Sequence, residues 1–472
     1  MKAYDLIIRR ADIVTAADRF TGDIGIHQGR IAAIGERLDP ALAEQTIDAA
    51  GRMVTPGGVD AHCHLDQPSA DGSVGSDDFL TGTRSAACGG TTTVIPFAMQ
   101  FKGQSLDNAV ADYHRRADGK ACIDYAFHLI ISDAAPEVVN EQLPRMVASG
   151  YSSFKIYMTY DALKLRDRDI LDVLDASRKL GALSMIHAEN DDCISWLTER
   201  LLKQGKSAPR FHAVAHSEIG EREATHRAIS LAELVDVPIL LVHVSSRSAL
   251  EQIYWARGKG LNIFSETCPQ YLFLTAEDLG IDDHFHGAKC ICSPPPRDTD
   301  SQNAIWTGLT NGTFSIFSSD HSPYNYDDPH GKKLHGDNAS FDRVPNGIPG
   351  LETRMPLLMS EGVLSGRLTP QRFVELTATA PAKLYGLYPQ KGTLSIGADA
   401  DIVIWDTQSD KTIRHADLHS AADYTPYEGK ALRAWPSITL ARGKVVWADG
   451  AFCGQAGDGR FLPCAAPFPP AI

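Results

Sequence analysis

Two histidines two residues apart, His62 and His64, are the first residues in the chain with types and spacing suited to metal chemistry. They end an apolar run from Val59 that reads as a β-strand, in which successive side chains alternate between the two faces. His62 and His64 therefore point the same way and supply half of a metal site. Alone, a His-x-His pattern among 17 histidines fits a chance pair on a surface strand equally well.

Four further polar residues stand at or near the ends of predicted strands: Lys155, His187, His243 and Asp320. Each has an ordinary structural explanation when taken singly. A lysine in an apolar strand can reach solvent, a histidine can be a satisfied core residue, and an aspartate can cap a helix. Together with His62 and His64, they mark the ends of five successive strand-like runs, and this joint pattern predicts a shared polar site.

The elements that must position these residues alternate between apolar strands and amphipathic helices. Helical patterns cover 167–180 and 222–234, and strand-like runs recur from 59 to 318. Repeated βα units over about 330 residues predict an α/β fold with a parallel sheet, and a (β/α)8 barrel over 56–391 fits the length and the element count. Active sites in such barrels lie at the C-terminal ends of the strands, where the candidate residues stand.

Short strands and turns occupy both ends of the chain. We expect 1–55 and 392–452 to join as one small β-sandwich domain, with the barrel inserted between them. Residues 453–472 are rich in Gly and Pro and read as a tail without its own core, loose or lying on a neighbouring subunit.

Composition narrows the class of protein. The 472 residues are 43% hydrophobic with a formal net charge of −14 and no basic run, which disfavours nucleic acid or an anionic membrane as partner. Nine scattered cysteines are typical of a reducing compartment, and Cys290 and Cys292 are interpreted as strand packing. No apolar N-terminal segment or stretch of 18 apolar residues is seen, so we expect a cytoplasmic protein.

Several motifs resemble the dihydropyrimidinase/D-hydantoinase family of the binuclear metal-dependent amidohydrolase superfamily. Besides the residues above, they include Gly89-Gly90-Thr91-Thr92, Lys155-Ile156-Tyr157-Met158-Thr159-Tyr160, His187-Ala188-Glu189-Asn190, Glu266-Thr267-Cys268-Pro269-Gln270-Tyr271, Cys292-Ser293-Pro294-Pro295, Ser319-Asp320-His321 and Pro345-Asn346-Gly347-Ile348-Pro349-Gly350. The resemblance covers about residues 4–450.

The resemblance implies a metal centre. His62, His64 and Asp320 would bind the more buried ion, and His187 and His243 the other. Lys155, carboxylated by CO2 to N6-carboxylysine, would bridge two divalent ions. Zinc suits the His/carboxylate set, and Mn2+ or Co2+ can substitute.

The resemblance also implies a reaction. A hydroxide bridging the two metals would attack the carbonyl of a cyclic ureide, a dihydropyrimidine or 5-substituted hydantoin, and give an N-carbamoyl amino acid. Tyr160 would donate to the developing oxyanion, Asp320 would pass a proton to the leaving nitrogen, and backbone groups of Ser293 and Asn346 would hold the ring. The family is commonly tetrameric, so a homo-oligomer, a tetramer or a dimer, is expected.

Some positions depart from the family pattern. Gln67 and the small polar loop 69–73 replace apolar residues, and Pro96 replaces an acidic one. In this family the loops after the first and third strands form the wall against the ring substituent, and Tyr157, Leu163 and Leu165 would be the third-strand contribution here. A polar first loop favours dihydrouracil-like rings or polar substituents.

Three alternatives remain in view. Allantoinase stays open, whereas dihydroorotase is disfavoured because no arginine stands beside the His-x-His motif. A non-catalytic scaffold relative would have lost metal ligands, and here all six positions are filled.

Overall fold

Eight parallel strands form the barrel in the computed structural model, which describes residues 2–69 and 71–470. The hydrogen-bonded order runs from the last strand to the first as β14 (Ile316–Phe317), β13 (Ile263–Thr267), β12 (Ile239–Leu241), β11 (Leu183–His187), β10 (Ser153–Tyr157), β9 (His128–Ile130), β7 (Thr91–Met99) and β6 (Gly58–Cys63), with β8 (Asp124–Tyr125) beside β7. Every pair is parallel. This confirms the predicted α/β barrel.

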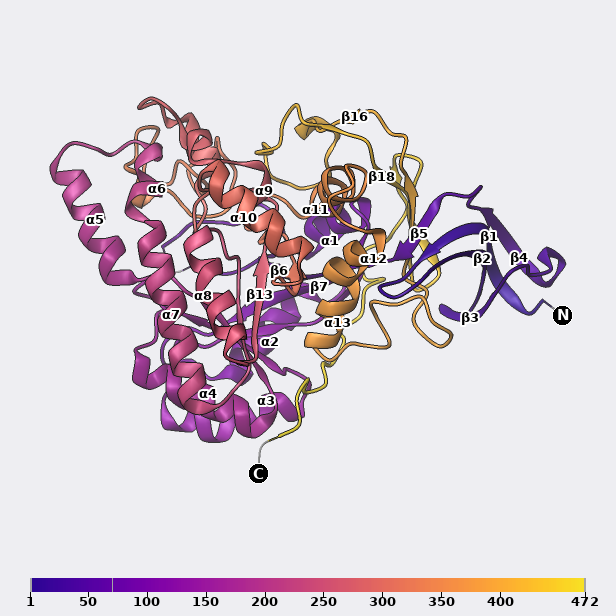
Figure 1. Ribbon diagram of the computed structural model, residues 1–472, viewed down its shortest axis with the longest axis horizontal. Helices are drawn as coiled ribbons and strands as arrows, with labels where there is room; N and C mark the ends of the chain where they lie inside the picture. The colour runs from indigo at the N-terminus through magenta and orange to yellow at the C-terminus, as the bar shows by residue number, and fades with distance from the viewer. Residues whose placement is uncertain (1, 70, 471–472) are drawn as a thin grey trace.

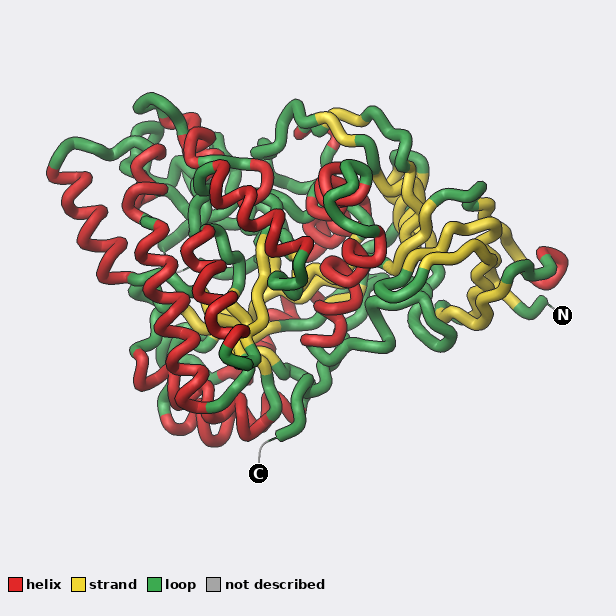
Figure 2. Tube along the Cα trace, viewed as in Figure 1, coloured by secondary structure: helices red, strands yellow, loops and turns green. Residues whose placement is uncertain are grey.

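Helices surround the strands on the outside (Figures 1 and 2). They are α1 (Phe79–Cys88), α2 (Leu106–Ala117), α3 (Leu143–Ala148), α4 (Asp167–Leu180), α5 (Asp191–Lys203), α6 (His212–Ala215), α7 (Glu218–Val235), α8 (Arg247–Gly258), α9 (Gln270–Phe273), α10 (Thr299–Thr310), α11 (Arg354–Leu358), α12 (Pro370–Val374) and α13 (Ala380–Leu384). Helix α4 spans the predicted residues. It buries Ile170, Val173 and Leu174 on one face and ends at Gly181, whose φ of 68° is left-handed.

A second sheet contains strands from both ends of the chain, to the right of the barrel in Figure 1. Its order is β20 (Ala451–Phe452), β19 (Lys444–Ala448), β18 (Trp435–Ala441), β15 (Ile402–Asp406), β5 (Met53–Pro56), β1 (Tyr4–Val14), β2 (Arg19–His27) and β3 (Arg30–Gly35), with β4 (Ala43–Asp48) also on β1. Antiparallel pairing of β5 with β15 joins the two chain ends. Buried residues of both ends, including Ile8, Val54 and Ile402, share one apolar cluster. A two-stranded ribbon, β16 (Lys411–Thr412) and β17 (Ala431–Leu432), completes the strands.

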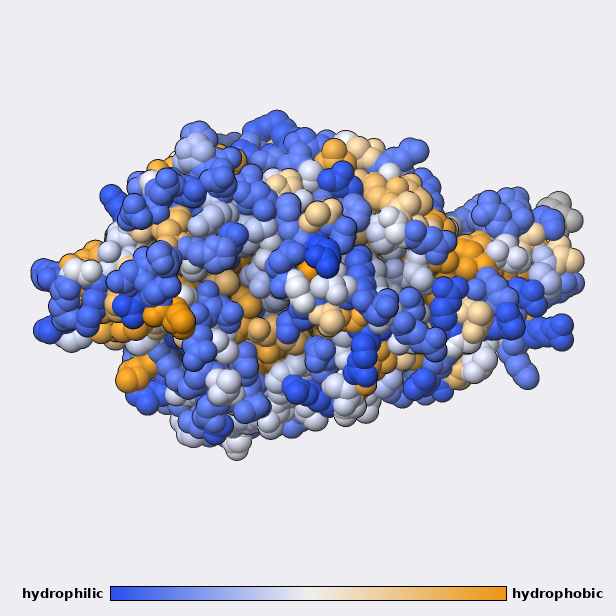
Figure 3. Space-filling view, turned by 90° about the horizontal axis from the view of Figure 1, so that it is seen from above, coloured by the Kyte–Doolittle hydropathy of each residue, from blue (hydrophilic) through white to orange (hydrophobic). Residues whose placement is uncertain are grey.

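The surface is mainly hydrophilic on the face in Figure 3, where apolar side chains form small separate patches. Among the described residues, no helix combines the length and apolar character required to cross a membrane.

The C-terminal tail differs from its expectation, because residues 457–468 lie on their own barrel. Leu462 N donates to Tyr125 O (2.7 Å), Cys464 N to Gly150 O (2.8 Å), and Phe468 N to Gly181 O (3.1 Å). Gly181 leaves room for this path, since an added Cβ would lie 2.1 Å from Phe468 O. The tail has no core of its own, but backbone groups at the base of the barrel hold it in place.

Gly181→Ala tests this packing against Gly205→Ala as matched control. Both glycines have left-handed φ, 68° and 73°, and follow helices, but a Cβ at Gly205 meets nothing within 4 Å. We expect the control to lose about 1 kcal/mol of unfolding free energy. Gly181→Ala should lose more and make the tail sensitive to protease, as read from denaturant unfolding and limited proteolysis. Equal losses with a protected tail would contradict the role of this contact.

Candidate active site

The structure brings every predicted site residue to one cavity of about 630 Å3 at the C-terminal ends of the barrel strands. His62 lies on β6, Lys155 on β10 and His187 at the end of β11, while His243 and Asp320 follow β12 and β14. The remaining lining residues from the prediction are His64, Tyr160, Ser293 and Asn346. His62 and Asp320, which are 258 positions apart in the chain, therefore meet because parallel strands deliver their ends to one rim.

The candidate ligand atoms fall into two adjoining groups. In the first, His62 Nε2 is 3.2 Å and His64 Nε2 is 3.5 Å from Asp320 Oδ1. In the second, His243 Nε2 is 2.9 Å from His187 Nδ1. Lys155 Nζ lies 3.2 Å from His62 Nε2, and ligand atoms of His62, His243 and Asp320 all lie within 4.8 Å of one another.

Neighbouring acceptors set the tautomers of three imidazoles. His62 Nδ1 donates to Glu266 Oε1 (2.6 Å) and His187 Nε2 to Glu189 Oε2 (2.8 Å). His64 Nδ1 donates to Gln67 Oε1 (2.6 Å). The other nitrogen of each ring then presents a lone pair toward the centre, which is the arrangement of metal-bound histidines and their supporting groups.

Burial disfavours the charged forms of these groups. It lowers the pKa of His62 and of His243 well below the ordinary histidine value, which favours the neutral imidazole that binds metals. It also lowers the pKa of Lys155, which is fully buried. The inward nitrogens of these neutral rings, close to the Asp320 carboxylate, fit a site for cations.

Three site residues have strained backbone. Tyr160, His243 and Asp320 have φ of 71°, 36° and 48°, in the left-handed region that non-glycine residues seldom adopt. Such strain persists where surrounding structure overdetermines it, and it concentrates at functional sites.

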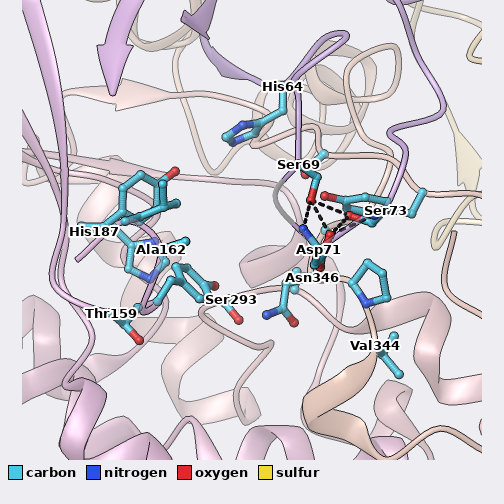
Figure 4. Close-up of a pocket in the computed structure, with 18 of the residues that line it drawn as sticks. His64, Ser69, Asp71, Ser73, Thr159, Ala162, His187, Ser293, Val344 and Asn346 are labelled. Carbon is cyan, nitrogen blue, oxygen red and sulfur yellow. Dashed lines mark hydrogen bonds between the residues drawn. The ribbon is translucent and has the colours of Figure 1, made fainter. Parts of the chain in front are cut away.

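The opposite wall of the cavity carries Ser293 and Asn346, which in the close-up lie between His187 and the loop of Ser69, Asp71 and Ser73 (Figure 4). Lys332 connects the two segments that bear the wall. Its buried Nζ donates to Ile291 O (2.9 Å) and Pro345 O (2.7 Å). Burial without an acidic partner lowers the pKa of Lys332 to about 7.

Polar atoms of the first loop are partnered within the protein. Gln67 binds His64 and lies 3.8 Å from Met99 Sδ, and Ser69, Asp71 and Ser73 bond to one another (Figure 4). These contacts give no support to a preference for polar substituents. On the other wall Tyr157 and Leu163 line the cavity, whereas Leu165 is buried outside the lining.

Sequence reasoning assigned no role to several residues of this region. Glu189 and Glu266 stood inside quoted motifs, but only their contacts to His187 and His62 reveal what they do. His212 and His216 come from the helical stretch before α7 and also line the cavity. The interpretation of Cys290 and Cys292 as strand packing is wrong, because Cys290 ends a 3-10 helix and Cys292 lines the cavity.

Comparisons with known proteins agree with the motifs. The model of the amidohydrolase family matches residues 53–446. A D-hydantoinase of Ralstonia pickettii is 43% identical over 459 residues, 97% of this chain and 98% of the relative. A D-phenylhydantoinase of Escherichia coli O8 (strain IAI1) is 40% identical over 472 residues, 99% of each chain. The crystal structure of dihydropyrimidinase from Brevibacillus agri NCHU1002 superposes with a TM-score of 0.94 at 42% identity, covering 98% of both chains. This chain therefore belongs to the dihydropyrimidinase/hydantoinase family of amidohydrolases.

Proposed function

We propose that this enzyme hydrolyses a cyclic ureide, a dihydropyrimidine or a 5-substituted hydantoin, to an N-carbamoyl amino acid. The observation that carries the proposal is the meeting of His62, His64, Lys155, His187, His243 and Asp320 in one cavity of a chain that matches D-hydantoinases over almost its full length. The D-specific names of those relatives support D-configured substrates.

We further propose two divalent cations as cofactors. His62, His64 and Asp320 would hold one, His187 and His243 the other, and a carboxylated Lys155 both. Imidazole and carboxylate donors suit zinc first, with manganese or cobalt as substitutes. When bound, such ions lower the pKa of water toward neutrality and polarise a carbonyl oxygen.

Carboxylation of Lys155 follows from its surroundings. Burial favours the neutral amine. Its nitrogen can bond to the carbon of CO2 and release a proton, which gives N6-carboxylysine. The resulting anion would face the cations, which would avoid an ammonium group buried beside imidazoles.

Residues of the chain then supply orientation and proton transfer. Desolvation raises the pKa of Tyr160 well above its ordinary value, so the phenol keeps its proton and can donate to an oxygen that gains negative charge. Asp320 stands among the histidines, where its carboxylate can take a proton from attacking water and deliver it to the ring nitrogen. Ser293 and Asn346 would hold the NH–CO–NH edge of the ring.

For the assembly and the compartment, we propose a homo-oligomer, a tetramer or a dimer, in the cytoplasm. Among the described residues all nine cysteines are free, as in a reducing compartment. A small ureide is the proposed partner.

Metal analysis coupled to a ring-opening assay tests this function. Dihydrouracil, hydantoin, both enantiomers of 5-phenylhydantoin and allantoin form the panel. We expect about two metals per chain and turnover of hydantoin or dihydrouracil rings. Lys155→Ala should lose at least about 100-fold in kcat/KM together with metal, whereas the surface variant Lys259→Ala should match wild type. A metal-free protein that opens no ring would refute the proposal, and preference for allantoin would favour the alternative.

Lys332→Met tests how the ring is held. The substitution removes two hydrogen bonds, to Ile291 O and Pro345 O, but touches no candidate ligand. We expect KM to rise about tenfold, the equivalent of about 1.4 kcal/mol of lost substrate binding, while metal content stays unchanged. Steady-state kinetics and metal analysis check this. An unchanged KM would show that Lys332 does not position the wall.

A further inference from the structure

The barrel has a seam between its first and last strands. β6 and β14 stand at opposite ends of the strand order. Among the described residues, one isolated bridge between Cys63 and His321 joins their extensions, and His64 N donates to His321 O (2.7 Å). No ladder of paired residues joins β6 to β14 in residues 2–69 and 71–470.

Side chains take the place of that ladder. Asp60, fully buried on β6, accepts from the backbone N–H of His62 (3.2 Å) and of Ser319 (3.2 Å). Ser319 Oγ donates back across the seam to His62 O (3.1 Å). The Asp60 carboxylate thus links the backbone of His62, a candidate ligand on β6, to that of Ser319, which precedes Asp320.

Arg354 is a second buried side chain at the same junction. Its fully buried guanidinium donates to Phe317 O on β14 (2.7 Å) and to Thr91 Oγ1 on β7 (2.9 Å), and its Nε lies 3.4 Å from Asp60 Oδ2. This buried cation contacts strands beside the seam, and its Nε faces the Asp60 carboxylate as an ion pair without a hydrogen bond.

The two metal positions differ in how the scaffold holds them. His187 ends β11 and His243 follows β12, and these two strands are neighbours in the ladder, as Ile186 pairs with Leu241. His62 and His64 stand on one side of the seam and Asp320 stands on the other. The distances from Asp320 Oδ1 are 3.2 Å to His62 Nε2 and 3.5 Å to His64 Nε2. Only the first group depends on the seam for its spacing.

We propose that Asp60 and Arg354 are positioning residues that set the affinity of the His62–His64–Asp320 position for its cation, and that this cation in turn closes the seam. The inference rests on the proposed two-metal function. Coupling between a bound ion and a structural junction is reciprocal. A change that loosens the seam therefore weakens binding of the ion, and removal of the ion loosens the seam.

Arg354→Lys tests whether the positioning residues set metal affinity. The lysine keeps the positive charge but lacks the two guanidinium donors that bind Phe317 O and Thr91 Oγ1. Two parent variants separate the metal positions. His243→Ala keeps only the first position intact, that of His62, His64 and Asp320, and His64→Ala keeps only the second intact, that of His187 and His243. In chelator competition with Zn2+, we expect Arg354→Lys to raise the Kd at least about tenfold in the first parent variant and less than about twofold in the second. Equal weakening in both, or in neither, would overturn the proposal.

Lys391→Met is the matched control for lost stability. Lys391 is another buried cation, paired with Asp124, Asp399 and Asp401 away from the cavity. We expect it to lower the denaturation midpoint without changing either Kd. A change in the Kd of the first parent variant would mean that metal affinity follows general stability, which would contradict the proposal.

Hydrogen exchange on the wild-type chain tests, without any variant, whether the cation closes the seam. After removal of Zn2+, the seam amides of His62, His64 and Ser319 should exchange faster by at least about tenfold, and those of Ile186 and Leu241 by less. Equal acceleration at both places would overturn the inference. A wild-type chain that binds no metal would instead refute the proposed function.

Discussion

Imidazole nitrogens, an amine and a carboxylate gathered in one buried space are the constraint on which the rest of the site depends. His243 Nε2 and His187 Nδ1 are 2.9 Å apart, and Lys155 Nζ and His62 Nε2 are 3.2 Å apart. Glu266, Glu189 and Gln67 hold protons on the outward nitrogens of three rings, so the inward nitrogens of those rings are left as acceptors. Two cations among these groups would be ligated by the inward nitrogens, and a carboxylated Lys155 would supply the negative charge that the proposed cations need.

The scaffold meets this constraint in two ways. Hydrogen-bonded neighbours β10 and β11 carry Lys155 and His187, and His243 follows the next strand, β12, two residues after the last pair of the ladder. Across the seam, the spacing of the ligands is set by buried polar side chains and by the strained backbone of Asp320. A barrel that closes through side chains can hold ligands whose separation depends on what binds there.

Strand periodicity and strand ends made much of this predictable. The alternation of apolar runs and amphipathic segments predicted the barrel, and α4 was predicted to the residue. The meeting of the six candidate residues was predictable because a barrel gathers strand ends at one rim, whereas their roles as metal ligands were implied by the family resemblance. Asp60, Arg354 and Lys332 were not, since their roles depend on partners distant in sequence, and a buried charge has no local signature. The path of the tail could not be predicted either, because its partners are backbone groups that are distant in sequence.

The occupancy of the centre is the most direct test of the central claim. A crystal structure of the protein purified with Zn2+ and bicarbonate, with anomalous scattering recorded at the zinc edge, would measure it. Two anomalous peaks are expected, one among His62, His64 and Asp320 and one between His187 and His243, with density for a carboxylate on Lys155 linking them. An unmodified Lys155 beside fewer than two peaks would contradict the binuclear centre.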